Sequence, residues 1–360
     1  MTELPIDLEG FEAAARDRAA PEAWEYLARG SGHDVTLHDN VAAWSRWRVL
    51  PHILVDVATV DTSGTVLGTA VRAPVLVAPT AMHRFFTDDG ELATARAADA
   101  AGTVFVVSMA GTTSVEDVAA AAPGGRHWAQ MYMLRDRGRT RALAERAGAA
   151  GYRAVVASVD GAAVGRGGAR ATAGSLAPPE WMRYPNLASP DDADTSDIMA
   201  LVSDFDPALT YDDLARFGEW SGGLPVVVKG VLRADDAARA VDAGASAIAV
   251  SNHGGRIFDG LPATADVLPE VVDAVAGRAE VYVDGGIRSG TDVLRALALG
   301  ATAVMTGRPV LCGLVVGGAE GAAAVLDRLR AQLEAAMAFC GAPTVDAVTR
   351  DLVVRAPGGA

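Results

Sequence analysis

Short apolar runs alternate with helical segments along most of the chain, from about residue 74 to residue 306. The runs are rich in Val, Ile and Ala and lack the alternation of a half-exposed strand, which is typical of parallel strands buried on both faces. Eight strand–helix alternations predict an α/β fold whose sheet closes into a TIM (β/α)8 barrel. The predicted strands are Pro74–Ala78, Thr103–Val107, His127–Met131, Ala154–Ser158, Pro225–Lys229, Ala247–Ser251, Glu280–Asp284 and Thr302–Thr306.

The first 60 residues precede this repeat. Helical spacing of apolar positions from Glu9 to Arg29, interrupted at Pro21, predicts N-terminal cap helices within residues 1–60. The stretch 34–60 carries two tryptophans and a proline. We expect it to be packing material without a role in the chemistry.

A second segment outside the repeat, residues 161–223, separates the fourth and fifth predicted strands by much more than one βαβ unit of about 30 residues. It is punctuated by glycine and proline and contains a polar, aspartate-rich stretch, which predicts a long flexible loop that closes over the barrel as a lid. No linker divides the chain, so we expect residues 1–360 to form a single barrel domain.

Composition and charge narrow the class of protein. The 360 residues are 50% hydrophobic and include 39 glycines, which suits a large core with many tight turns. The formal net charge of -14 argues against a nucleic acid or an anionic membrane as partner, since both need a basic face. Without a signal-peptide pattern or an uncharged apolar run of membrane-spanning length, we expect a cytoplasmic protein. Cys312 and Cys340 belong to no Cys/His cluster, so we expect neither a disulfide framework nor a metal site.

Polar or glycine-rich residues follow each of the eight predicted strands. The active site of a TIM barrel forms at the carboxyl ends of its strands, so these residues are expected to meet in one place. In chain order they are Pro79-Thr80-Ala81, Ser108, Gln130 with Tyr132, Ser158 with Asp160, Lys229, Ser251 to Arg256, Asp284 to Arg288, and Gly307-Arg308.

The loop Ser-Asn-His-Gly-Gly-Arg at 251–256 places a titratable imidazole three positions before a fixed cation. His253 and Arg256 can therefore face one small pocket beside a backbone that its glycines let approach a ligand closely. The alternative is a buried histidine hydrogen-bonded at a strand end and an arginine in a surface ion pair.

Two glycine-rich loops, 284–288 and 307–308, each carry an arginine, and the first leads into a helix expected to begin near Thr291. Converging backbone N–H groups, a helix start and two arginines predict a phosphate site. Lys229 suits a ring that becomes anionic on reduction, and flavin mononucleotide (FMN) satisfies both requirements. The residues expected to bind FMN are Pro79, Thr80, Ala81, Ser108, Gln130, Ser158, Lys229, Ser251, Asp284, Gly285, Gly286, Arg288, Gly307 and Arg308.

The chain resembles the FMN-dependent α-hydroxy acid oxidases and dehydrogenases, the group of glycolate oxidase, lactate oxidase and mandelate dehydrogenase. The resemblance extends over nearly the whole chain, and its most specific blocks are the Ser-Asn-His-Gly-Gly-Arg and Asp-Gly-Gly-Ile-Arg sequences. The matching blocks are Ala78–Met82, Gly90–Ala98, Gln130–Tyr132, Val228–Gly230, Ser251–Arg256, Asp284–Asp292 and Gly307–Pro309.

This resemblance implies oxidation of a 2-hydroxy acid to the 2-oxo acid, with FMN taking the electrons and oxygen or another acceptor receiving them. It also implies a homo-oligomer, a tetramer by analogy with the family. Carried over by position, the implied catalytic residues are His253 as base, Asp160 as its carboxylate partner, Tyr132 as the hydroxyl that orients the substrate, and Lys229 beside the flavin. The implied substrate-binding residues are Arg256 as the carboxylate clamp, Tyr26 and Tyr132.

The chain departs from the family pattern at three positions. A second substrate arginine would fall on Gly167, so that Arg166 or Arg170 would have to replace it. Ala110 and Leu134 stand where glycolate-type enzymes often carry aromatic residues, which predicts an enlarged pocket and a bulky, mandelate-like or specialised 2-hydroxy acid. Two alternatives remain: an isomerase-like FMN barrel whose flavin stays reduced, and a flavin-binding barrel with lost or altered catalysis. The sequence does not distinguish an oxidase from a dehydrogenase.

Overall fold

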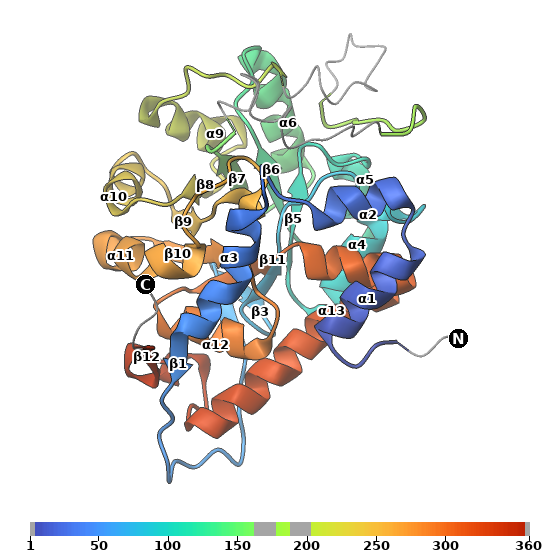
Figure 1. Ribbon diagram of the computed structural model, residues 1–360. Helices are drawn as coiled ribbons and strands as arrows, with labels where there is room; N and C mark the ends of the chain where they lie inside the picture. The colour runs from blue at the N-terminus through green and yellow to red at the C-terminus, as the bar shows by residue number, and fades with distance from the viewer. Residues whose placement is uncertain (1–3, 162–177, 188–202, 357–360) are drawn as a thin grey trace.

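The computed structural model describes residues 4–161, 178–187 and 203–356, and its centre is a closed barrel of eight parallel strands wrapped by helices (Figure 1). The predicted TIM barrel is confirmed. Around the barrel the strands follow the order β10, β11, β4, β5, β6, β7, β8, β9. Their bounds are β4 (Val75–Val77), β5 (Val104–Ser108), β6 (Arg126–Met131), β7 (Val155–Ser158), β8 (Val226–Val231), β9 (Ala247–Val250), β10 (Glu280–Asp284) and β11 (Ala303–Thr306).

Each barrel strand overlaps the run predicted for it. Two small antiparallel sheets lie outside the barrel, one formed by β1 (Trp47–Val49) with β12 (Val353–Arg355) and one by β2 (Gly64–Val66) with β3 (Thr69–Val71). The α-helices are α1 (Leu8–Arg18), α2 (Pro21–Ala28), α3 (Val35–Ala43), α4 (Gly90–Ala101), α5 (Val115–Ala121), α6 (Arg137–Ala149), α9 (Leu214–Trp220), α10 (Ala234–Asp242), α11 (Thr264–Val275), α12 (Gly290–Ala298) and α13 (Arg308–Cys340). The 3-10 helices are η1 (Trp44–Arg46), η2 (His83–Phe85), η4 (Tyr211–Asp213), η5 (His253–Gly255), η6 (Val345–Ala347) and η7 (Arg350–Leu352).

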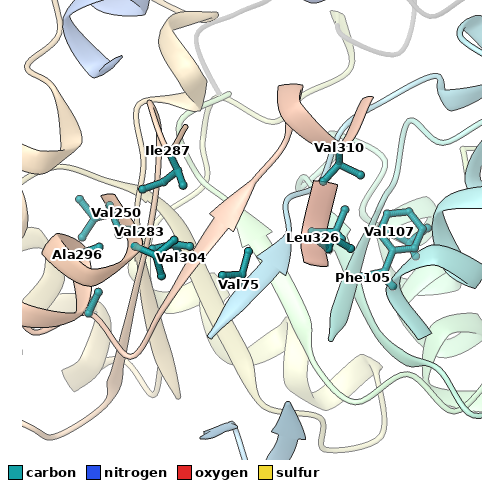
Figure 2. Close-up of a cluster of buried hydrophobic side chains, with 14 of the residues drawn as sticks. Val75, Phe105, Val107, Val250, Val283, Ile287, Ala296, Val304, Val310 and Leu326 are labelled. Carbon is teal, nitrogen blue, oxygen red and sulfur yellow. The ribbon is translucent and has the colours of Figure 1, made fainter. Parts of the chain in front are cut away.

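Alternate residues of each barrel strand face the helices and the barrel interior, and both sets are apolar, which is why the runs show no alternation in the sequence. Figure 2 shows the helix-facing set, in which strand residues such as Val75 and Phe105 share a cluster with Val310 and Leu326 of α13. The interior set is a separate cluster that contains Leu76, Val106, Trp128, Val156, Val227, Ala249 and Tyr282.

The barrel interior becomes polar at the carboxyl ends of the strands. On most strands, the residue two positions after the last apolar interior residue points to the same face and is polar. Together these side chains form a buried layer across the barrel mouth. The polar members are Ser108, Gln130, Ser158, Lys229, Ser251 and Asp284, and Ala78 lies in the same layer. The sheet geometry therefore supplies the polar floor of a binding site.

The long helix α13 is the one described helix that could cross a membrane by length and composition alone. Most of its apolar window is buried, however, because the helix packs against α4, α1 and α12. Gly317 and Gly318 interrupt its helical backbone. Its apolar character is thus explained by the protein core. Cys312 and Cys340, both on this helix, are buried free thiols, and the described residues contain no His/Cys/Asp/Glu group suited to hold a metal.

The expectation that residues 34–60 only fill space is wrong. Asn40 on α3 exchanges two amide hydrogen bonds, of 2.9 and 2.8 Å, with Asn252 in the loop after β9. Trp44 donates a 2.9 Å hydrogen bond from its indole to the carbonyl of Gly285 in the loop after β10. The N-terminal segment therefore supports two loops of the barrel mouth.

We predict that Asn40→Ala lowers the free energy of unfolding by about 1–3 kcal/mol, because it removes both hydrogen bonds between Asn40 and the buried Asn252 amide. Urea titration monitored by circular dichroism measures the loss. Ser45→Ala is the matched control, since this exposed hydroxyl bonds only locally to Ala42 and its removal should cost less than about 0.5 kcal/mol. Equal effects of the two substitutions would contradict the supporting role of Asn40.

Candidate active site

A cavity of about 280 Å³ lies above the polar layer, at the carboxyl ends of the barrel strands. It brings together most of the residues predicted from the sequence, although they come from distant parts of the chain. Those that line it are Tyr26, Pro79, Thr80, Ala81, Ser108, Ala110, Gln130, Tyr132, Ser158, Lys229, His253, Arg256, Asp284, Gly285, Gly286, Arg288, Gly307 and Arg308.

Three side chains form a hydrogen-bonded chain at one side of this cavity. The Nδ1 atom of His253 lies 3.0 Å from Oδ2 of Asp160, and its Nε2 atom lies 3.2 Å from the hydroxyl of Tyr132. Burial alone would raise the pKa of Asp160, but the neighbouring His253 and Lys229 outweigh it and hold this pKa below its ordinary value. Burial, and next the Asp160 charge, raises the pKa of Tyr132 well above 10. The arrangement therefore pairs an ionised carboxylate and a protonated phenol with the imidazole.

The backbone of the histidine loop is strained. His253 has a φ of 57°, in the left-handed region that side chains rarely adopt, and Gly254 and Gly255 follow in the same region. A Cβ on Gly255 would lie 2.7 Å from the backbone nitrogen of Leu37, so α3 leaves room only for glycine. The side chain of Asn252 and the hydroxyl of Ser251 accept hydrogen bonds from backbone N–H groups of the loop. These contacts hold the imidazole at the cavity wall.

A buried ion pair crosses the floor of the cavity. The Nζ atom of Lys229 lies 3.0 Å from Oδ2 of Asp284 and donates a 2.8 Å hydrogen bond to the hydroxyl of Ser251. Burial alone would lower the pKa of Lys229, but Asp284 and Asp160 outweigh it and raise this pKa. The ammonium is therefore fixed in its charged form. The other carboxylate oxygen of Asp284 is buried and has no hydrogen-bond partner among the described residues.

Gln130 links the polar side chains on the neighbouring part of the floor. Its amide oxygen accepts a 3.1 Å hydrogen bond from Ser108, and its amide nitrogen donates a 3.0 Å hydrogen bond to Ser158. These bonds fix the orientation of the amide without closing the cavity. The result is a planar polar edge next to the cation of Lys229, since Ser158 and Lys229 lie in register on β7 and β8.

Three guanidinium groups, those of Arg256, Arg288 and Arg308, face the remaining side of the cavity. Burial, followed by the charges of Arg256 and Arg288, lowers the pKa of Arg308 to about 9. No carboxylate among the described residues forms an ion pair with Arg308 or Arg256, and Arg288 has only the distant Glu12 at 3.8 Å. A cluster of like charges held this close calls for a bound anion.

The glycine loop after β10 is shaped for close backbone approach. A Cβ on Gly286, whose φ is 78°, would lie 1.9 Å from the carbonyl oxygen of Asn40. Helix α12 then begins at Gly290, one residue before the expected start, because Ser289 caps it by accepting a hydrogen bond from Asp292. Backbone N–H groups, a helix start and the arginine cluster therefore fit the phosphate of FMN, and the polar floor fits its ring.

The guanidinium of Arg256 is hydrogen-bonded to the protein backbone and also lines the cavity. Its Nη1 atom donates hydrogen bonds of 2.7 and 2.9 Å to the carbonyls of Tyr26 and Arg29, and its guanidinium carbon lies 4.4 Å from the centre of the Tyr26 ring. These contacts with Tyr26 and Arg29 fix the position of the planar guanidinium. Its remaining N–H groups can bind a carboxylate with two parallel hydrogen bonds.

The structure corrects two of the predicted site residues. Leu134 does not enlarge the pocket, because it is fully buried away from the cavity and its backbone pairs with Phe205. Ser251 does not reach the cavity either, because its hydroxyl is used by Lys229 and by the backbone of His253. The positions expected to supply a second substrate arginine, 165–170, lie outside the described residues, as do residues 162–177 and 188–202 of the predicted lid. The last part of that segment is not a flexible loop, because it forms η4 and the barrel helix α9.

Sequence reasoning missed two residues that the structure places at the site. Phe205 lines the cavity and stacks on Tyr132, although no motif surrounds it in the sequence. His83 is fully buried behind Thr80, with 2.6 Å between its Nε2 atom and the Thr80 hydroxyl. The only sequence feature that could have indicated His83 is its position next to the block that follows the first predicted strand.

Comparisons with known proteins agree with this geometry. A family model described as FMN-dependent dehydrogenase matches residues 15–355. The chain is 44% identical to the L-lactate oxidase of Nostoc sp., with 94% of each chain covered. It is 40% identical to 2-hydroxyacid oxidase 1 of Homo sapiens, with 98% of this chain and 97% of the relative covered.

Solved structures of mandelate oxidase share both fold and sequence with this chain. A mutant of that enzyme with (S)-mandelic acid matches with a TM-score of 0.87 and 39% identity, covering 99% of this chain and 100% of the other. These relatives are oxidases of 2-hydroxy acids, which favours oxidation over the isomerase alternative. The chain therefore belongs to the family of FMN-dependent dehydrogenases and is an oxidoreductase that uses FMN to oxidise the CH–OH group of 2-hydroxy acids.

Proposed function

We propose that the protein oxidises a bulky 2-hydroxy acid to its 2-oxo acid, with His253 as the general base. The observation that carries this proposal is the convergence of two groups on one cavity: the Tyr132–His253–Asp160 chain and the Arg256 guanidinium. A 2-hydroxy acid presents a hydroxyl and a carboxylate on neighbouring carbons. One side of the cavity offers a base and a hydrogen-bond donor, and another offers a fixed cation.

The reaction removes two protons and two electrons from the substrate. In the proposal His253 takes one proton at Nε2, and the imidazolium that forms is stabilised by Asp160 3.0 Å from Nδ1. Tyr132 remains protonated because of its raised pKa, so its hydroxyl can donate a hydrogen bond to the substrate oxygen. When it is bound, FMN would take the two electrons together with the second proton, and oxygen or another acceptor would complete the turnover.

The expected size of the substrate rests on Ala110, whose methyl group lines the cavity. A small residue here leaves space that an aryl or extended side chain can fill. Burying that apolar surface gains about 25 cal/mol per Å² and compensates for the family arginine that Gly167 replaces. Glycolate and lactate have little apolar surface to bury.

Anaerobic addition of mandelate should bleach the flavin absorbance of the wild-type enzyme. His253→Asn should retain FMN but slow this reduction by about 10²–10⁴-fold, because it removes the general base and keeps the size of the side chain. Stopped-flow absorbance measures the rate, and the FMN released on denaturation checks cofactor content. Near-normal reduction by the variant would assign the proton to another base, and no bleaching of the wild type by any 2-hydroxy acid would refute the proposed function.

Arg256→Lys should chiefly weaken substrate capture, with KM rising on the order of tenfold or more and a smaller change in the maximal rate of flavin reduction. An ammonium cannot reproduce the planar two-point contact with a carboxylate, and it cannot reach both backbone carbonyls that now hold Arg256. Saturation curves of the reduction rate against mandelate concentration provide the measurement. Unchanged curves would remove Arg256 from substrate binding.

Ala110→Trp should reverse the substrate preference. In the wild type kcat/KM should be higher for mandelate than for lactate or glycolate, and the indole should lower the mandelate value on the order of tenfold to a hundredfold by filling the proposed space. Ala110→Ser, which barely changes the volume, is the matched control. If glycolate is the best substrate of the wild type, or if Ala110→Trp spares mandelate, the proposed substrate size is wrong.

A further inference from the structure

The phenol ring of Tyr132 has a stacking partner that no motif indicated. The ring of Phe205 lies parallel to it, with 4.1 Å between the ring centres and 20° between the planes. Phe205 is only 7% exposed and lines the same cavity as the Tyr132 hydroxyl. We propose that Phe205, with Gly161 beside the stack, is a positioning residue that holds the Tyr132 hydroxyl on His253.

Gly161 gives the stack its space. A Cβ at this position would lie 2.7 Å from Cε1 of Tyr132, 3.0 Å from Cδ1 of the same ring and 3.4 Å from Cδ2 of Phe205. The first of these distances is shorter than real Cβ contacts allow. Even an alanine would therefore displace the tyrosine ring, and the two rings fit because position 161 has no side chain.

The segments that carry the two rings are joined through their backbones. The N–H of Asp206 donates a 2.8 Å hydrogen bond to the carbonyl of Met133, and the N–H of Arg135 donates one of the same length to the carbonyl of Asp204. The Arg137 side chain adds a 2.9 Å ion pair to Asp206. Phe205 is thus fixed in register with the loop that follows β6.

The stack has a consequence for the reaction because Tyr132 acts through its hydroxyl. The ring can rotate about two side-chain bonds, and only one orientation brings the hydroxyl to 3.2 Å from Nε2 of His253. Phe205 selects this orientation by packing and keeps water from the phenol. The restraint is steric, because a ring whose centre lies 4.1 Å from that of the phenol leaves little room for the phenol to rotate.

A double-mutant cycle tests the proposal, which rests on the proposed function for its kinetic readout. Phe205→Leu keeps an apolar wall but removes the stack, and should lower kcat with mandelate on the order of tenfold with a smaller change in KM. If Phe205 acts through the Tyr132 hydroxyl, the same substitution in a Tyr132→Phe background should change kcat by less than about twofold. Equal effects in the two backgrounds would overturn the proposal.

Phe217→Leu is the matched control for general loss of aromatic packing, because Phe217 is fully buried in α9 away from the cavity. It should lower Tm while leaving kcat and FMN content close to wild type, and its effects should be additive with Tyr132→Phe. A kcat loss equal to that of Phe205→Leu would make the role of Phe205 merely structural and overturn the proposal.

Crystal structures of the FMN-loaded enzymes give a readout independent of turnover. In Phe205→Leu and Gly161→Ala the Tyr132 hydroxyl should leave hydrogen-bond distance of His253, whereas Gly64→Ala, at a glycine with no atom within 4 Å of the added Cβ, should leave it in place. A Tyr132 hydroxyl that stays on His253 in both variants would overturn the proposal. If no 2-hydroxy acid reduces the wild-type flavin, the proposed function fails, and these structures alone decide the role of Phe205.

Discussion

The buried ammonium of Lys229 connects the two halves of the active site. It forms an ion pair with Asp284 on one side, and on the other its charge acts together with His253 to lower the pKa of Asp160. Burying a charged ammonium without partners would cost several kcal/mol in lost hydration. The two carboxylates and the Ser251 hydroxyl offset this cost and keep Lys229 charged. The polar floor of the cavity and His253 consequently share one charge network.

The electrostatic field in the cavity is positive, although the net charge of the molecule is negative. The chain carries a formal net charge of -14, yet three arginines and Lys229 line the cavity. Burial, followed by the charges of Arg256 and Arg288, lowers the pKa of Arg308, so its positive charge is costly at this place. A phosphate at the glycine loop and a carboxylate at Arg256 would both relieve it. The same field attracts anionic substrates to the cavity.

The sequence predicted the features that depend on local pattern and on the geometry common to all TIM barrels. Lys229 and Gln130 were found because each lies at the carboxyl end of a predicted strand, and strand ends converge in this fold. Phe205 and Asn40 were missed because each acts across a long stretch of chain, and a single aromatic or amide side chain carries no periodic signal. Leu134 was misplaced because the sequence shows which residue follows a strand but not which way the loop turns.

The carboxyl end of α2 positions two of the three arginines that line the cavity. Arg256 donates to the carbonyls of Tyr26 and Arg29, and Arg308 donates to those of Leu27 and Arg29. The last carbonyls of a helix have no partners within the helix and carry a partial negative charge, so they attract cations. The carboxyl end of α2 thus helps to build the cavity, because its carbonyls hold two of the guanidinium groups that line it.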